Sequence, residues 1–198
     1  MTTTFLSLRN QARDRADQSQ SRFVSESELG TYINNSIKEL YDLLVASSAD
    51  YYIKDPLAFT LTGVQDGFSL PSDFYKLRGL DQSIDSSGAA SSWRTVRNFN
   101  FQERNRFNQQ NSIVSSYAQV RYRVFADSAG PLLKLIPQEN AAGVYQLWYI
   151  PSCPTLVADG DTFDGINGWE EYVILLEEMT RKKTAQGFGS FAQRCLEV

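Results

Sequence analysis

The stretch from Ser25 to Leu44, SESELGTYINNSIKELYDLL, decides the fold of this chain. It opens with a capping box, in which the Ser25 hydroxyl accepts a backbone N–H and Glu28 reaches back toward the start of the helix. Apolar residues then recur at three- and four-residue steps in one stripe: Leu29, Tyr32, Ile33, Ile37, Leu40, Tyr41 and Leu44. At about 1.5 Å per residue, this pattern predicts a scaffold helix of roughly 35 Å.

Two weaker helical patterns lie on either side of this stretch. The first predicts a short helix near the start of the chain, from the spacing of Phe5, Leu6, Leu8, Ala12 and Ala16. The second predicts a last helix from the spacing of Trp169, Tyr172, Val173, Leu175, Leu176 and Met179. The basic run 181–183 follows it and suits a helix C-terminus.

Between these helices the apolar residues alternate with polar ones, which is typical of strands. Phe59 and Leu61 alternate with threonines before turn residues at 63–67, so a hairpin with 68–71 is expected. Further strands are predicted at 76–80, 117–125, 132–136 and 144–149, the last three as a β-meander because the turns are too short for parallel crossovers. A short helix over 101–108, capped by Asn100, and a small-residue loop at 85–92 complete the region.

Together these patterns predict an α+β fold. A helical scaffold, made of an N-terminal helix pair plus a C-terminal helix, brackets an antiparallel β insertion. We expect the N-terminal helices in 1–55, the β insertion with its short helix in 56–150, and a loop, the C-terminal helix and a docking tail in 151–198. A chain of 198 residues with this pattern is expected to form one folded unit overall.

The composition argues against several classes of function. The net charge of −4 lacks the positive field of a dedicated DNA-wrapping protein. Without any histidine, the chain lacks the usual general base and the commonest zinc or iron ligand, and Cys153 and Cys195 match no zinc spacing. No apolar run approaches the ~20 residues of a membrane span, and the start MTTTFLSLRNQ lacks a secretory pattern. We therefore expect no catalytic residue, no cofactor, no metal and no membrane partner.

Three local clusters could still carry chemistry. Asp159 to Gly165 resembles a calcium loop, but Phe163 and Asp164 stand where a ligand oxygen and a glycine are needed, which favours an acidic turn capping the last helix. The last helix carries two adjacent pairs of carboxylates, Glu170 with Glu171 and Glu177 with Glu178. Adjacent residues on a helix point about 100° apart, so these pairs predict a solvated acidic face and not the paired acids of a glycosidase. The third cluster has a composition typical of a nucleic-acid platform: Arg94, Arg97, Arg104 and Arg106 interleaved with Trp93, Phe99, Phe101 and Phe107. The acidic Glu103 and the overall charge favour protein contact or packing for it.

Several linked segments resemble, in their order and spacing, the head-to-tail adaptor proteins of tailed bacteriophages, also called connector or neck proteins. The segments are Phe23 to Leu44, Phe68 to Asp81, Trp93, Phe101 to Asn105, Trp148 to Pro151 and Gly168 to Val173. They are packing and turn motifs, spread over nearly the whole chain.

This resemblance implies a structural virion protein, made in the host cytoplasm and located in the neck between capsid and tail. It implies a homo-oligomeric ring, typically of twelve copies, that joins the portal to the tail and gives the genome a channel for packaging and ejection. The implied partners are other copies of the chain, the portal protein, a tail or nozzle protein, and DNA that passes without specific binding. No catalytic residue follows from the resemblance.

The residues suggest where such a ring would make its contacts. Acidic subunits favour passage of DNA over sticking, so the candidate lumen-facing residues are Glu170, Glu171, Glu177 and Glu178. The tail 184–198 would bury little alone, so we expect Phe188, Phe191 and Leu196 to dock on the portal or a neighbouring subunit. Three alternatives stay open: another tail or baseplate structural protein, a virion-associated cell-wall hydrolase using carboxylates alone, and a nucleic-acid-binding module.

Overall fold

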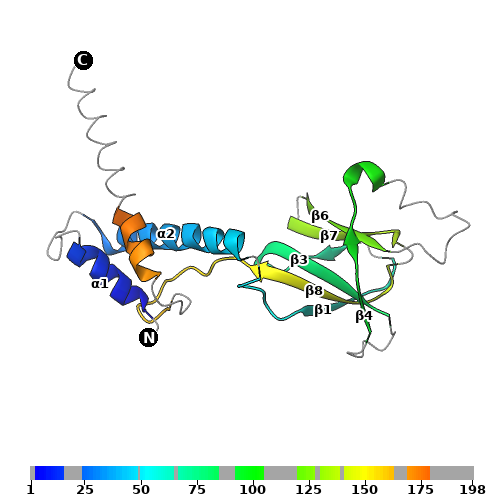
Figure 1. The fold of residues 1–198 in the computed structure, drawn as a ribbon, viewed down its shortest axis with the longest axis horizontal. Coiled ribbons are helices and arrows are strands. Elements are labelled where there is room, and N and C mark those ends of the chain that lie inside the picture. Colours follow the sequence, from blue (N-terminus) through cyan, green and yellow to red (C-terminus); the bar gives the residue numbers. More distant parts are fainter. Residues whose placement is uncertain are drawn as a thin grey trace, which may run out of the picture. The chain divides into compact units, whose positions relative to one another are not determined.

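A computed structural model of the protein describes residues 3–15, 24–48, 50–64, 67–84, 92–104, 120–127, 130–138, 141–162 and 169–178 (Figure 1). The chain divides into two compact units. The helical unit comprises Met1–Ala49 and Cys153–Val198, and the β unit comprises Asp50–Ser152. Helices precede and follow the strands along the chain, so the predicted α+β class is confirmed.

The helical unit contains α1 (Phe5–Arg15), α2 (Glu26–Ser47) and a helix over 170–178, drawn in orange in Figure 1. Ser25 caps α2 as predicted, because its hydroxyl accepts the backbone N–H of Glu28 at 3.2 Å. The predicted stripe of α2 faces inward, where Leu29, Ile33 and Ile37 are buried. The long helix is therefore specified by its local sequence.

One apolar core joins the three helices and the segment that precedes the last one. Its buried members are Phe5, Leu8, Ala12, Leu29, Ile33, Ile37, Leu40, Leu156, Val173 and Ile174. The prediction for the first helix is wrong at Leu6, which is 44% exposed. An α-helix turns about 100° per residue, so Phe5, Leu8 and Ala12 share the buried side while Leu6 points away from it.

The β unit contains two four-stranded sheets around a shared core. The first has the order β1 (Leu57–Leu61), β8 (Gly143–Pro151), β3 (Phe74–Ser83), β4 (Trp93–Thr95) and is antiparallel throughout. The second has the order β2 (Phe68–Ser69), β7 (Gly130–Ile136), β6 (Arg121–Asp127), β5 (Arg97–Asn98). Buried side chains from both sheets, among them Leu80, Leu133 and Tyr145, form one cluster.

The pairing of strands corrects three predictions. The hairpin expected from 59–61 and 68–71 does not form, because β1 pairs with β8 while β2 pairs with β7. The β-meander is wrong after its first turn, since β6 and β7 form a hairpin but β8 crosses to the other sheet. The insertion is also not wholly antiparallel, because β5 runs parallel to β6. Strands that are adjacent in sequence separate here because each places its apolar face against the opposite sheet.

Some expected elements are shorter than predicted or lie outside the described residues. The short helix is observed as the 3-10 helix η1 (Phe101–Glu103), and Asn100 caps it by accepting the N–H of Gln102 at 3.4 Å. The loop predicted at 85–92 falls almost wholly outside the described residues, as do 105–119. None of the helices within the described ranges is long and apolar enough to cross a membrane.

Candidate interaction surface

The most distinctive surface of the β unit lies on the outer side of the second sheet. Alternation along β6 sends Tyr122 and Val124 toward the core, so Arg121 and Arg123 point to the other side. Arg121 pairs with Arg97 of β5, and Arg123 pairs with Lys134 of β7. Because residues directly opposite each other point to the same side, these four side chains form one basic face, defined here as Arg97, Arg121, Arg123 and Lys134.

An aromatic cluster borders this basic face. The Phe101 ring is 44% exposed, and the Arg104 guanidinium lies 4.5 Å from its centre. The Arg123 guanidinium lies 5.4 Å from the same ring and 5.7 Å from the ring of Phe125. The two rings meet edge to face with centres 6.2 Å apart. Stacked arginine and exposed phenylalanine are the side chains enriched at protein interfaces.

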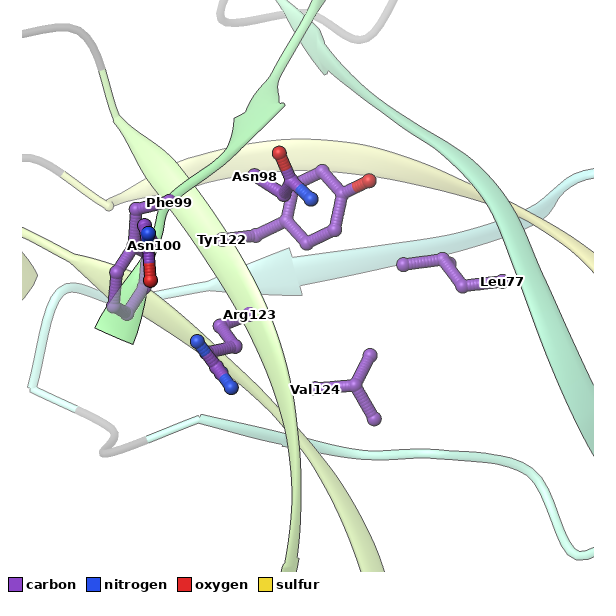
Figure 2. Close-up of a pocket in the computed structure, with 7 residues that line it drawn as sticks. All are labelled: Leu77, Asn98, Phe99, Asn100, Tyr122, Arg123 and Val124. Atoms are coloured by element: carbon purple, nitrogen blue, oxygen red, sulfur yellow. The ribbon is translucent and has the colours of Figure 1, made fainter. Parts of the chain in front are cut away.

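A pocket opens between β3 and the β5–β6 edge of the second sheet (Figure 2). It has a volume of about 550 Å³ and is lined by Leu77, Asn98, Phe99, Asn100, Tyr122, Arg123 and Val124. Leu77 comes from β3, whereas the other lining residues come from β5, from the segment after it and from β6. Burial raises the pKa of Tyr122, which stays a neutral phenol at ordinary pH. The lining suits a side chain of a partner that has an apolar stem and a polar end.

The arginine–aromatic cluster predicted from the sequence is divided by the structure. Arg94 belongs to the first sheet, where it donates to Gln82 Oε1 at 2.6 Å, and Phe99 is buried at 5% exposure. Arg97 and Arg104 do take part in the surface, whereas Arg106 and Phe107 lie outside the described residues. The sequence reasoning missed Arg121, Arg123 and Lys134. Their alternation in RYRVF and LLKLI was the available signal, but only the strand register brings them together.

Two of the four acidic residues predicted for the last helix bind α1 or the residues before it. Glu170 accepts a hydrogen bond from Thr3 Oγ1 at 2.7 Å, and Glu171 forms an ion pair with Arg15. This pair lowers the pKa of Glu171 and raises that of Arg15. Both carboxylates therefore help to hold the helical unit together.

The expectation of a solvated acidic face is wrong for Glu177, which is 1% exposed. It lies three and four residues after Ile174 and Val173, which are both buried, so all three share the inner side of the helix. Glu178 is half-buried. The burial of Glu177 argues against a place on a channel, and for Glu170, Glu171 and Glu178 that assignment depends on an assembly and stays a prediction.

The acidic turn that resembles a calcium loop has a structural role in its described part, 159–162. The Asp161 carboxylate accepts the backbone N–H groups of Val157 at 2.7 Å and Ala158 at 2.8 Å, which lowers its pKa. The carbonyls of Asp161 and Asp159 accept the N–H groups of Phe5 at 2.8 Å and Leu6 at 3.2 Å. This part of the turn thus caps α1, whereas the sequence had predicted that the turn caps the last helix. No group of metal-ligating side chains that could hold an ion occurs among the described residues.

These observations define a class of protein. The described residues present a surface of arginines and exposed aromatic rings, which are enriched where proteins contact other proteins, and this indicates an interaction protein. The chain belongs to the SU10 adaptor protein family, whose model matches residues 3–186. A comparison with curated proteins gave no match. The chain is therefore a structural adaptor protein of a bacteriophage and a virion component, and its family implies association with other virion components and a role that is not enzymatic.

Proposed function

We propose that this adaptor forms a dodecameric ring in the neck of a tailed phage, where it joins the portal protein to the tail and gives DNA a channel. The observation that carries the proposal is the family match over residues 3–186, which covers both units of the chain. The resemblance to head-to-tail adaptors supplies the ring and its place between portal and tail. In this reading DNA passes through the ring without specific binding.

The presence of two units, each with its own apolar core, supports a joining role. A protein that links two other components needs separate surfaces for each contact and for its own copies. A helical unit and a β unit that each fold around their own core can present such surfaces independently. The proposal therefore implies that the contacts within the ring and the contacts with partners are divided between the two units.

Two further parts of the proposal concern particular residues. The tail residues Phe188, Phe191 and Leu196, which lie outside the described residues, dock on the portal or a neighbouring copy. The exposed carboxylate of Glu171 and its neighbours Glu170 and Glu178 line the lumen and repel the DNA backbone. The burial of Glu177 leaves it no part in such a lining.

The test is to purify the particles that carry this chain and to image them by cryo-electron microscopy. A closed ring between portal and tail is the expected result, and counting its subunits gives the copy number. Density at the baseplate or along the tail would replace this function by that of another tail structural protein. A lumen lined by lysine and arginine would refute the acidic lining.

The cell-wall hydrolase alternative has a direct test of its own. Zymography on peptidoglycan is expected to show no activity for the purified chain. A cleared band that disappears on changing Glu170→Gln and Glu171→Gln would show a lytic role for the carboxylates. The involvement of these residues in contacts with Thr3 and Arg15 argues against such a role.

A further inference from the structure

We propose that the basic face of the second sheet, together with Phe101 and Arg104 at its border, binds an acidic face on α2 of a second copy of this chain. This inference rests on the proposed ring and names the surfaces that hold its copies together. It starts from a feature of the single chain that is unfavourable by itself.

That feature is the pairing of like charges across strands. Arg97 lies directly opposite Arg121, and Arg123 lies directly opposite Lys134. Like charges at opposed positions destabilise a sheet. Among the side chains that the structure describes, which do not include those of Glu103 and Asp127, no carboxylate lies at ion-pair distance from Arg97, Arg123 or Lys134. An anionic partner would relieve the repulsion between Arg123 and Lys134.

The distribution of charge along the chain indicates what that partner is. Segment 97–136 holds six basic and two acidic residues, a charge of +4 in a chain whose net charge is −4. The rest of the chain therefore carries −8. Two copies placed with the basic face of one against the acidic part of the next attract each other, and a head-to-tail contact of this kind is the type that builds a ring when the rotation between copies closes. The same acidic excess repels the phosphates of DNA, so the charges favour a second copy over nucleic acid.

The complementary surface in this proposal is the acidic face of α2, defined as Glu39, Asp42 and Leu43. These residues are spaced three and four apart, so they share one side of the helix, opposite the buried stripe. Glu39 and Asp42 are exposed, and Leu43 is 50% exposed. Two carboxylates beside an exposed leucine match arginines beside the exposed ring of Phe101.

The first test uses assembled particles. A zero-length carbodiimide reagent joins amines to carboxylates that are in contact, and it is expected to link Lys134 to Glu39 or Asp42. Particles assembled from a mixture of isotope-labelled and unlabelled copies show whether the linked residues belong to different copies. A ring without this link, joined through other surfaces, would overturn the inference and leave the proposed function intact. Absence of any ring would remove both.

The second test reverses a charge and compares matched variants. Arg123→Glu is expected to lower incorporation into particles roughly tenfold to a hundredfold, in line with the loss of a close charge pair. The control is Lys76→Glu, an equal change at an exposed position of β3 in the first sheet, which is expected to leave incorporation unchanged. Adding Glu39→Arg to Arg123→Glu is expected to restore assembly.

A folding measurement separates docking from structure. In the single chain, Lys134→Glu places a carboxylate opposite Arg123 and leaves the ring contacts of Arg123 in place, so this variant is expected to lose incorporation while the melting temperature of the isolated protein holds or rises. A residue with only a structural role would show the reverse, lower stability together with lower incorporation, and that result would refute the inference. Ultraviolet crosslinking of the peptide 97–136 to DNA in the same particles would also refute it, by assigning the basic face to phosphate.

Discussion

The side chain of Asn34 fastens α2 to the segment that leads into the last helix, and its removal gives the sharpest test of the helical unit. Its amide Nδ2 donates to the Leu156 carbonyl at 3.0 Å, and its Oδ1 accepts the Leu156 N–H at 2.9 Å. Leu156 is 4% exposed and belongs to the core formed with α1 and α2. Asn34→Ala therefore leaves a donor and an acceptor of the backbone without their partners.

The magnitude follows from these two bonds. Each intramolecular hydrogen bond contributes about 0.5–1.5 kcal/mol net, so both together contribute about 1–3 kcal/mol. Alanine has a higher helix propensity than asparagine by up to ~0.7 kcal/mol, and this gain would hide part of the stability lost with the two hydrogen bonds. Asn35→Ala is the matched control, because Asn35 is the next residue of α2 and is exposed. The difference between the two variants isolates the contacts with Leu156.

The assay is urea denaturation followed by far-ultraviolet circular dichroism, with hydrogen exchange of the α2 amides as a local measure. Asn34→Ala is expected to lower the free energy of unfolding by about 1–3 kcal/mol relative to Asn35→Ala. Asn34→Asp keeps the oxygen that accepts the Leu156 N–H but loses the Nδ2 donor, so its loss of stability is expected to include at least the bond to the Leu156 carbonyl. Equal stability of Asn34→Ala and Asn35→Ala would refute the reasoning.

Three further predictions concern single positions. Ser25→Ala removes the cap of α2 and is expected to cost about 1 kcal/mol, measured by urea denaturation; an unchanged midpoint would show that the cap is dispensable. Gly67→Ala places a Cβ 2.6 Å from the Leu133 carbonyl oxygen, so faster hydrogen exchange of β2 is expected, and unchanged exchange would contradict this close approach. The ion pair with Lys54 and the hydrogen bond from Tyr149 hold the pKa of Asp73 below its ordinary value of 3.8. The stability that ionised Asp73 contributes is therefore present above pH 3.8 and is lost as the pH falls through the lowered pKa. In wild-type protein the urea midpoint should fall with pH below about pH 4, and Asp73→Asn is expected to weaken this dependence.

The sequence was most informative where a segment carries its own local determinants. The capping serine and the apolar stripe of α2 predicted both the start and the buried side of that helix, because a helix makes its hydrogen bonds within itself. The order of helices and strands could be predicted because the period of the apolar residues, 3.6 in a helix and two in a strand, is read from neighbouring residues. The family resemblance, which rests on the order and spacing of these segments, is confirmed at the level of a phage adaptor.

Strand pairing could not be predicted in the same way. The turn residues after Leu61 and Ile136 are as compatible with a hairpin as with a crossing between sheets, and in both places the chain crosses. Which occurs depends on how the apolar faces of two sheets fill one core, as in the stacking of Phe59 of β1 on Phe68 of β2, whose ring centres lie 3.9 Å apart. That choice involves residues distant in the chain.

The candidate sites show the same division. Sequence alone determined the acidic balance, the lack of histidine and the presence of an arginine–aromatic segment. The tertiary structure decided that Glu177 is buried, that the acidic turn caps α1, and that Arg121, Arg123 and Lys134 share a face with Arg97. Composition and helical period are properties of neighbouring residues, whereas a surface is made by strand register and packing, which bring together side chains that lie far apart in the sequence.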